Sequence, residues 1–378
     1  MKIAYVHTGL WPSDSPSTTF ATYNCLGLSE NFETCRFFVK KNSEKSSDQI
    51  FKDTFGIMKP ENLNVIMVRK PFFNTNTFYF RSIYKILSGY AKEKQLDAVI
   101  TRNVTFLPYL IRLKNKLGVK VFFETHDFFA DLSLRDDIDI SKKRKQERIE
   151  NRYIPYLSGL ICLQQSQADL YKKKFPCINA EVFRTGIIRY HESNENREYI
   201  TYIGSLDPLK GIETLIKALP YSKARPELVI IGGKNNAEIE KIKKLAEDSG
   251  IKSKVNITGW VNKYELDRYL KQTLIGILPT KNTFFNRYLT SPLKLFDYYS
   301  YGIPVIASDL PVNRELIEEN RTGIFFESEN PEELAHKIDQ LISKKDEIAQ
   351  MSGYIYKNTG YLLWNNRGKL LYDWIKKN

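Results

Sequence analysis

The sequence predicts an α/β protein with two doubly wound parallel sheets, one in each half of the chain. At 378 residues the chain is longer than one ordinary core and suits two domains of average size. Short apolar, β-branched runs alternate with helical patterns in both halves, which is typical of βαβ units. A polar stretch without periodicity separates the halves. Hydrophobic residues make up 42% and charged residues 27%, which favours a packed globular protein over a disordered or fibrous one.

The first domain is expected at residues 1–188. Its expected strands are KIAYV, NVIMV, DAVIT, VKVFFET and GLICL, at residues 2–6, 64–68, 97–101, 119–125 and 159–163. Helical patterns lie between some of these strands, at residues 81–94 and 105–118.

The second domain is expected at residues 199–355, after a linker at residues 189–198. Its expected strands are YITYIGS, ELVIIGG, VNITGWV, IGILPT, PVIAS and TGIFFES, which begin at residues 199, 227, 255, 275, 304 and 322. Helices are expected at residues 211–220, 236–250 and 330–351, and the closing residues 356–378 suit helices with an apolar side. Open parallel sheets bind ligands beyond the carboxyl ends of their strands, so function is expected at strand ends and helix starts.

The charge of the chain is +13 and uneven, with 29 basic and 19 acidic residues among the first 188. Its densest basic stretches, residues 141–148 and 171–175, suit an anionic lipid, a nucleic acid or an acidic substrate, or are simply solvated helix faces. No apolar run approaches the length of a membrane span, and the first residues lack the pattern of a secretory signal. The four cysteines show no zinc-site spacing. A cytoplasmic protein without a metal or other cofactor is expected.

The stretch SPLKLFDYYSYGIPVIAS, residues 291–308, reads as a helix followed by a buried strand. Ser291 is expected to cap the helix, and Pro292 suits its first position. Lys294 then lies in the first turn, where it opposes the helix dipole by about 0.3–1 kcal/mol unless an anion is bound there. Asp297 lies on the same side one turn later and could accept hydrogen bonds from sugar hydroxyls. The alternative is an exposed Lys–Asp pair worth about 0.3–0.5 kcal/mol.

A second lysine has the same kind of position. In YIGSLDPLKGIETLIKAL, residues 202–219, a strand ends at Gly204 and Lys210 with Gly211 opens a helix. Two cationic helix starts on one sheet could hold a diphosphate, although Lys210 taken alone could simply face solvent.

These two stretches, with NITGWV and IGILPT between them, resemble the nucleotide-binding half of the family 4 glycosyltransferases, which are retaining enzymes of the GT-B fold. The resemblance covers nearly all of the second domain. It implies two Rossmann-like domains that face each other across a cleft, with a C-terminal helix that crosses back onto the first domain. Trp364 and Arg367 are similar to residues of that helix.

The resemblance also implies roles for individual residues. Lys210 and Lys294 would neutralise the departing diphosphate, Asp297 would bind the ribose, and the main chain of residues 259–261 would meet the base. The donor-binding residues implied are Ser205, Lys210, Gly259, Trp260, Val261, Ser291, Pro292, Leu293, Lys294 and Asp297.

Several positions depart from the family pattern. Leu289 stands where the family often has a glutamate that contacts the transferred sugar, and Ser205 stands where an arginine is usual. A glycine pair expected in the first domain is absent near Gly9, so Thr18 and Thr19 are its candidate replacements on the acceptor side.

The string ETHD places His126 and Asp127 just beyond a strand of the first domain. A lone histidine at a strand end is more often structural. The resemblance favours His126 as a catalytic residue that positions the sugar, with Asp127 on the acceptor side.

The expected function is a retaining, metal-independent transfer of a hexose or N-acetylhexosamine from a nucleotide-diphosphate sugar to a hydroxyl of a glycan or lipid-linked acceptor, in bacterial surface polysaccharide or glycoconjugate synthesis. UDP is the favoured nucleotide because it is common in the family, and the basic first domain could rest on an anionic membrane. Two alternatives are an epimerase of the same fold and a non-catalytic nucleotide-sugar binder. No nucleic-acid module accompanies the positive charge, and no GxGxxG fingerprint points to a nicotinamide cofactor.

Overall fold

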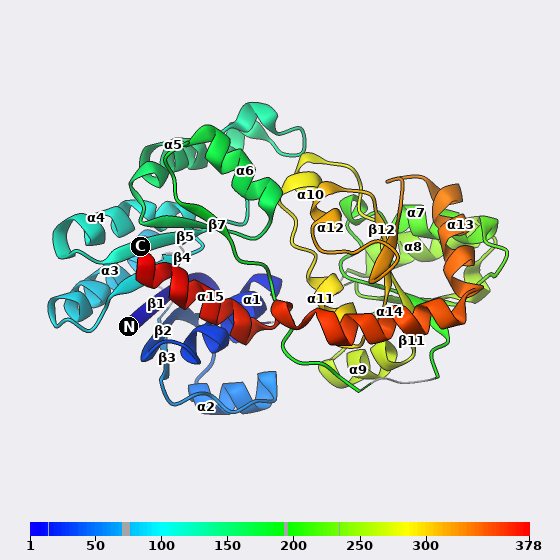
Figure 1. The fold of residues 1–378 in the computed structure, drawn as a ribbon, viewed down its shortest axis with the longest axis horizontal. Helices are drawn as coiled ribbons and strands as arrows, with labels where there is room; N and C mark the ends of the chain where they lie inside the picture. The colour runs from blue at the N-terminus through cyan, green and yellow to red at the C-terminus, as the bar shows by residue number, and fades with distance from the viewer. Residues whose placement is uncertain (14, 70–75, 193–195, 234) are drawn as a thin grey trace. The chain divides into compact units, whose positions relative to one another are not determined.

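The computed structural model describes residues 1–13, 15–69, 76–192, 196–233 and 235–378. The chain divides into two compact units (Figure 1). The first unit contains Met1–Gly186 and Leu362–Asn378, and the second contains Ile187–Tyr361. The linker expected at residues 189–198 includes residues 193–195, which lie outside the described residues.

The first unit is built on a parallel sheet of seven strands in the order β3-β2-β1-β4-β5-β6-β7. Strand β1 pairs with β2 on one side and β4 on the other, so that Tyr5 lies between Phe37 and Ile100. The strands are β1 (Lys2–Trp11), β2 (Thr34–Lys41), β3 (Leu63–Val68), β4 (Ala98–Thr101), β5 (Lys120–Glu124), β6 (Gly159–Cys162) and β7 (Ala180–Val182).

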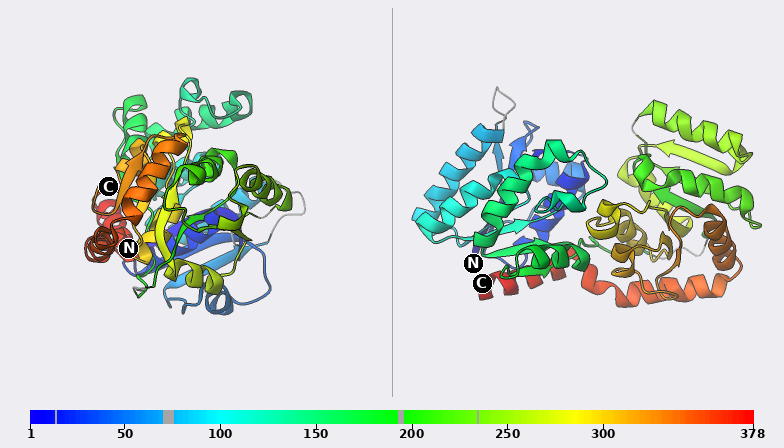
Figure 2. Two further views of the ribbon diagram at one scale, coloured as in Figure 1. Left: turned by 90° about the vertical axis from the view of Figure 1, so that its right-hand side faces the viewer. Right: turned by 90° about the horizontal axis from the view of Figure 1, so that it is seen from above.

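Helices flank this sheet (Figure 2). They are α1 (Pro16–Ser29), α2 (Ser47–Ile50), α3 (Asn76–Lys92), α4 (Leu107–Leu117), α5 (Arg144–Tyr153), α6 (Gln165–Lys174) and α15 (Trp364–Lys377).

The last helix of the chain, α15, packs on α1. Its Leu371 and Ile375 are fully buried in the same apolar cluster as Ala21 and Cys25 of α1. The two backbones approach so closely that a Cβ at Gly368 would lie 1.9 Å from the carbonyl oxygen of Gly27. Glycine is therefore required at this crossing, because any side chain would push α15 away from α1.

The second unit is built on a parallel sheet of six strands in the order β10-β9-β8-β11-β12-β13. The strands are β8 (Tyr199–Ile203), β9 (Leu228–Ile231), β10 (Val255–Gly259), β11 (Thr273–Leu278), β12 (Val305–Ser308) and β13 (Gly323–Phe326). The helices are α7 (Ile212–Ala218), α8 (Asn236–Asp248), α9 (Lys263–Lys271), α10 (Phe284–Tyr288), α11 (Leu293–Ser300), α12 (Pro311–Arg314), α13 (Pro331–Ile342) and α14 (Lys345–Asn358).

The predicted fold class is confirmed, because both units are doubly wound parallel sheets. All of the strands predicted in the second domain are present, whereas β2, β7 and α1 of the first unit were not anticipated. The single helix expected at residues 330–351 is two helices that meet at Ser343 and Lys344. Within the described residues, no helix combines the length and the apolarity needed to cross a bilayer.

Candidate functional site

The candidate site lies where β8 and β11 of the second unit end. These neighbouring strands mark the point at which the strand order reverses, because β8 leads outward to β9 and β11 leads outward to β12. Open α/β sheets bind ligands at such a point. Two loops follow these strands: residues 204–211 carry Lys210, and residues 279–292 lead into α11 and Lys294.

Two glycines bring these loops together. Gly211 has φ +73°, and a Cβ there would lie 1.6 Å from the carbonyl oxygen of Pro279 at the end of β11. Gly204 has φ +140°, and a Cβ there would lie 3.3 Å from Nζ of Lys294. Gly211 needs glycine because both its conformation and the nearby carbonyl oxygen exclude a side chain, and Gly204 favours glycine because of its backbone conformation.

Lys294 lies in the first turn of α11 with its ammonium group turned inward. Its Nζ lies 4.1 Å from the centre of the Tyr202 ring. This nitrogen is buried and has no hydrogen-bond partner in the described part of the chain. Burial and, to a lesser extent, the nearby Lys210 lower the pKa of Lys294 to about 7. An unpaired buried ammonium is costly, so an anion at this place would be strongly favoured.

Lys210 ends a single turn of 3-10 helix, Pro208–Lys210. Asp207 caps this turn by accepting a hydrogen bond of 2.8 Å from the backbone N–H of Leu209. Burial lowers the pKa of Lys210, and Asp207 opposes that shift. No carboxylate in the described residues forms an ion pair with either Lys210 or Lys294. Two unneutralised cations at adjacent strand ends make an anion-binding arrangement.

Asp297 lies one turn after Lys294, and the two do not pair with each other among the described residues. Burial raises the pKa of Asp297 to about 6. The exposed Lys–Asp pair considered from the sequence is therefore not what the structure contains. Among the residues that the structure describes, Asp297 has no cationic partner, which leaves it suited to accept hydrogen bonds from hydroxyl groups.

The predicted cap of α11 is wrong. The helix begins at Leu293, and Pro292 occupies the cap position with extended backbone and no capping side chain. Ser291 therefore lies one residue before the cap. Leu289, in the same loop, is only 1% exposed. It therefore packs in the interior of the unit.

The residues predicted to meet the base lie at the end of β10. The carbonyl oxygen of Gly259 accepts a hydrogen bond of 2.9 Å from the N–H of Gly232, and a Cβ at Gly232 would lie 1.9 Å from the carbonyl oxygen of Gly204. The ends of β8, β9 and β10 thus touch through their backbones. Trp260 is 55% exposed, Val261 is half-buried, and Ser205 is exposed beside Gly204.

In the first unit, His126 follows β5 and lies beside a buried acid. Its Nε2 lies 4.0 Å from Oε2 of Glu124, and Phe20 packs edge-on against its ring at 5.0 Å. Burial and the nearby Arg102 lower the pKa of His126 to about 4, so the ring is neutral near pH 7. Glu124 is fully buried and accepts hydrogen bonds from Arg367 of α15 and from Tyr5.

The other residues predicted for the acceptor side have different structural environments. Asp127 forms an ion pair with the buried Arg135, which indicates a structural role. Thr18 is buried and its hydroxyl lies 3.1 Å from Nε2 of His7. A Cβ at Gly9 would lie 2.2 Å from the same nitrogen, so this glycine is required by packing. Thr19 is half-buried in the first turn of α1.

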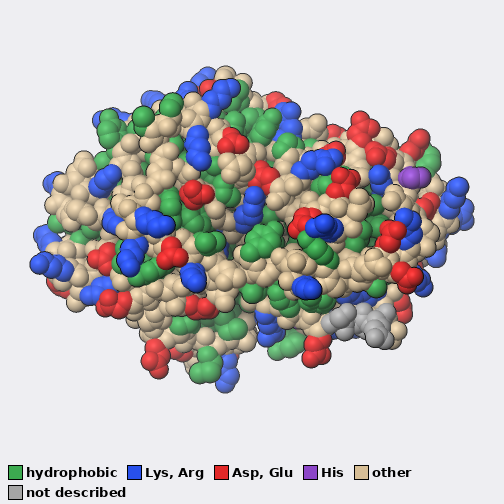
Figure 3. Space-filling model, viewed as in Figure 1, with side chains coloured by type: hydrophobic (Ala, Val, Ile, Leu, Met, Phe, Trp, Pro, Cys, Tyr) green, Lys and Arg blue, Asp and Glu red, His purple; other side chains and the backbone are tan. Residues whose placement is uncertain are grey.

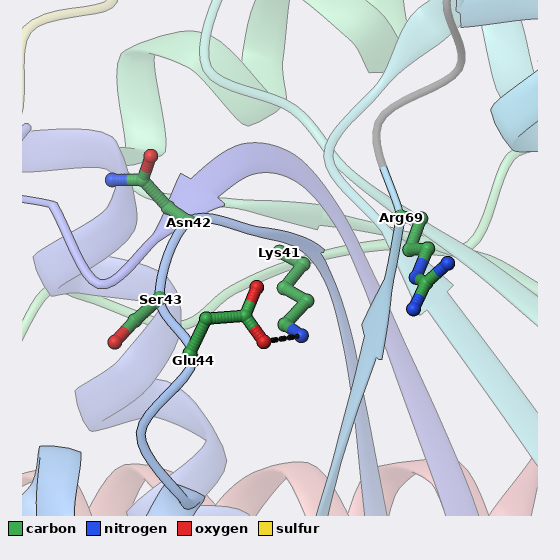
Figure 4. A pocket seen from close by; sticks show the side chains of 5 residues that line it. All are labelled: Lys41, Asn42, Ser43, Glu44 and Arg69. Atoms are coloured by element: carbon green, nitrogen blue, oxygen red, sulfur yellow. Dashed lines mark hydrogen bonds and ion pairs between the residues drawn. The ribbon is translucent and has the colours of Figure 1, made fainter.

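A separate cavity of about 510 Å³ lies at the ends of β2 and β3 (Figure 4). Lys41 and Glu44 form an ion pair there, and Arg69 directly follows the neighbouring strand β3. Asn42 and Ser43 complete the lining. None of the residues predicted for the donor or the acceptor lines this cavity. In the described residues, no group of three His, Cys, Asp or Glu side chains is placed to hold a metal ion, and metal independence stays a prediction.

Three contacts were not found from the sequence, two at the candidate site of the second unit and one beside His126 in the first unit. Tyr202 lies beneath Lys294, Asn286 of α10 binds the loop that carries Lys210, and Arg367 neutralises Glu124. The strand pattern places Tyr202 in β8 but does not place it against α11. Asn286 and Arg367 carry no local signal, since their partners are distant in the sequence.

Comparison with known proteins gives a family match for part of the chain. Residues 184–358 match the model of the family described as glycosyl transferases group 1. This segment belongs to that family. The matched residues of this glycosyltransferase segment include both lysine loops and α11.

Curated relatives match the glycosyltransferase segment at low identity. A GDP-mannose-dependent α-(1-6)-phosphatidylinositol monomannoside mannosyltransferase of Mycobacterium tuberculosis is 26% identical over 159 residues, which cover 41% of each chain. A D-inositol 3-phosphate glycosyltransferase of Corynebacterium urealyticum is 24% identical over 182 residues, 46% of this chain and 42% of that protein. The chain thus spans less than half of the length of these two relatives.

Solved structures resemble the whole chain. Sucrose-phosphate synthase of Thermosynechococcus elongatus has a TM-score of 0.77 at 13% identity, over 100% of this chain and 98% of the other. Anabaena HepE in complex with UDP-glucose has a TM-score of 0.74 at 12% identity, over 100% of both chains. At this identity the likeness concerns the fold, which is GT-B, as the sequence predicted.

Proposed function

We propose that this protein is a retaining glycosyltransferase of family 4. It transfers a hexose or N-acetylhexosamine from a nucleotide-diphosphate sugar to a hydroxyl group of a glycan or lipid-linked acceptor in bacterial surface polysaccharide or glycoconjugate synthesis. The observation that carries the proposal is the buried, unpaired ammonium of Lys294 beside Lys210 at the ends of β8 and β11.

The diphosphate of the donor would lie against these two lysines. Their positive charge favours the departure of the diphosphate, because charge that develops on the leaving oxygen is stabilised in a site that is already organised. Asp297 would accept hydrogen bonds from the ribose hydroxyls, and the backbone at residues 259–261 would meet the base. We propose UDP as the nucleotide of the donor. Among similar proteins, Anabaena HepE binds UDP-glucose and the Mycobacterium tuberculosis mannosyltransferase depends on GDP-mannose, so both nucleotides belong in the test.

The chemistry proposed needs no metal and no other cofactor. In a retaining transfer of this kind, the leaving phosphate oxygen itself takes the proton of the acceptor hydroxyl, and the protein aligns the two sugars. His126 is proposed to act as a neutral hydrogen-bonding group toward the sugar. Its low pKa, about 4, supports the neutral form.

The test is a thermal-shift and turnover assay with UDP-, GDP- and ADP-sugars. Saturation at about 100 times the dissociation constant adds about 2.7 kcal/mol of stability, and Lys294→Met should remove most of that gain at the same ligand concentration. The variant without ligand should be at least as stable as the wild type, because it removes an unpaired buried charge. A ligand-induced shift that survives in Lys294→Met would contradict the proposal.

The second candidate is a protein that binds a nucleotide sugar without transferring it. The burial of Leu289 supports this alternative, since an interior leucine cannot contact the transferred sugar. Resolving the sugars after incubation separates the cases. Transfer gives a glycosylated acceptor, an epimerase gives a changed donor, and a binder gives neither.

A cytoplasmic location with peripheral contact to an anionic membrane is also proposed. The basic stretch at residues 141–148 supports it only in part, because Lys142 pairs with Asp139 and Arg144 pairs with Glu147. On the face drawn in Figure 3, basic side chains are interspersed with acidic ones. Equal binding to anionic and neutral liposomes at low salt would remove this proposal.

A further inference from the structure

Asn286 joins the two loops of the candidate site. It lies in α10, between β11 and α11, and its side chain is buried. Its amide nitrogen donates hydrogen bonds to the carbonyl oxygens of Leu209, at 3.0 Å, and Lys281, at 2.9 Å. Its amide oxygen accepts a hydrogen bond of 3.1 Å from the hydroxyl of Thr290. The hydrogen bond with Thr290 is buried, and the two with the carbonyl oxygens are partly buried.

The bond to Leu209 is the important one. Leu209 directly precedes Lys210, and its carbonyl oxygen also accepts a hydrogen bond of 3.3 Å from the backbone N–H of Lys281. The neighbouring Phe285 of α10 lies 5.9 Å from Nζ of Lys210, measured to the ring centre. The short helix α10 therefore holds the loop of Lys210 against the segment that leads to Lys294.

Holding these loops together requires work against electrostatic repulsion. The two ammonium groups are close enough for Lys210 to disfavour the charged form of Lys294. A carboxylate at this place would relieve the repulsion but would also neutralise the charge that a diphosphate needs. A neutral amide holds the backbone and leaves both charges available, which is the condition for a preorganised anion site.

We propose that Asn286 is a positioning residue that fixes the Lys210 loop at the distance from Lys294 at which both ammonium groups contact the donor diphosphate. The inference rests on the proposed function, in which these two lysines bind that group. Asn286 itself contacts neither the donor nor the acceptor.

The test compares Asn286→Leu with the matched control Asn313→Leu. Leucine is similar in size to asparagine, donates no hydrogen bond and adds no charge. Asn313 is also buried in the second unit, and its amide donates a hydrogen bond of 2.8 Å to the carbonyl oxygen of Ser308, at the end of β12, instead of to the loop of Lys210. Both variants lose a buried amide, but only Asn286→Leu releases the Lys210 loop.

The readout is the ratio of the dissociation constants of uridine and UDP, measured by calorimetry or by competition. This ratio isolates the phosphate contribution, which a general loosening of the fold would not selectively change. We expect Asn286→Leu to lower the ratio about 10- to 100-fold, the loss that a displacement of about 1 Å causes in an aligned site. Asn313→Leu should leave the ratio unchanged.

Thr290→Val provides a milder variant if Asn286→Leu does not fold. It removes the hydroxyl that orients the amide and should lower the ratio in the same direction by a smaller factor. A wild-type ratio retained in a folded Asn286→Leu, or in Thr290→Val if the first variant is unfolded, would overturn the inference. If the wild type binds UDP no more tightly than uridine, the proposed function itself fails.

Discussion

The affinity for a UDP-sugar should fall steeply as pH rises above 7. In the free protein the pKa of Lys294 is about 7, because burial and Lys210 disfavour its charged form. A bound diphosphate would raise the pKa of Lys294 again, because it favours the charged ammonium. At any pH at which Lys294 of the free protein is neutral, binding must therefore take up a proton. At pH 8 only about one tenth of the free protein carries the charge, and the affinity should fall about tenfold for each further pH unit.

Isothermal titration calorimetry between pH 6 and pH 9 measures this effect. A UDP-sugar is the right ligand, because its diphosphate lacks the terminal phosphate proton that titrates near pH 6. Buffers with different ionisation enthalpies report the number of protons taken up, which should approach one at pH 8.

The lower limit of the pH profile depends on Asp297. Its pKa is about 6 because burial favours the neutral acid, so affinity should also decline below pH 6 as the carboxylate acceptor is lost. The optimum should therefore lie between about pH 6 and pH 7. Lys294→Met should bind weakly and show no decline above pH 7. A wild-type affinity that stays constant from pH 7 to pH 9, without proton uptake, would refute the reasoning.

Two further substitutions test the structure around the site. Arg367→Met leaves the carboxylate of Glu124 buried without its main counter-charge and should lower the free energy of unfolding by about 3–5 kcal/mol in urea titrations. Adding Glu124→Gln should recover part of that loss, and an Arg367→Met variant as stable as the wild type would show that the pair is not required. Gly211→Ala forces a side chain into a left-handed conformation and against Pro279, so it should cost about 1–3 kcal/mol and weaken UDP binding. Unchanged UDP affinity in this variant would mean that the turn does not set the position of Lys210.

The second unit could be predicted from the sequence in more detail than the first. Each of its strands is a short apolar run between clear turn signals, and each was found. In the first unit, β2 carries Arg36 and Lys40 within its apolar run, and β7 is only three residues long at the edge of the sheet. Such segments become strands because they pair with a neighbouring strand, and the pattern of apolar residues within the segment does not show that pairing.

The charged residues of the site could be proposed from the sequence, because the reasoning depends only on the position of each residue within its own helix or loop. A lysine in the first turn of a helix is unfavourable by itself, and this applies to Lys294 without knowledge of any contact. The exact start of α11 was misjudged because Pro292 takes the cap position with extended backbone. Contacts between residues far apart in the sequence could not be predicted. Arg367 and Glu124 are separated by 243 residues, and Asn286 and Leu209 by 77.

A crystal structure of the protein with UDP tests the central claim most directly. We expect phosphate oxygens within about 2.7–2.9 Å of Nζ of both Lys210 and Lys294, with Asp297 hydrogen-bonded to the ribose. A nucleotide bound elsewhere, or phosphates bound without contact to Lys294, would contradict it.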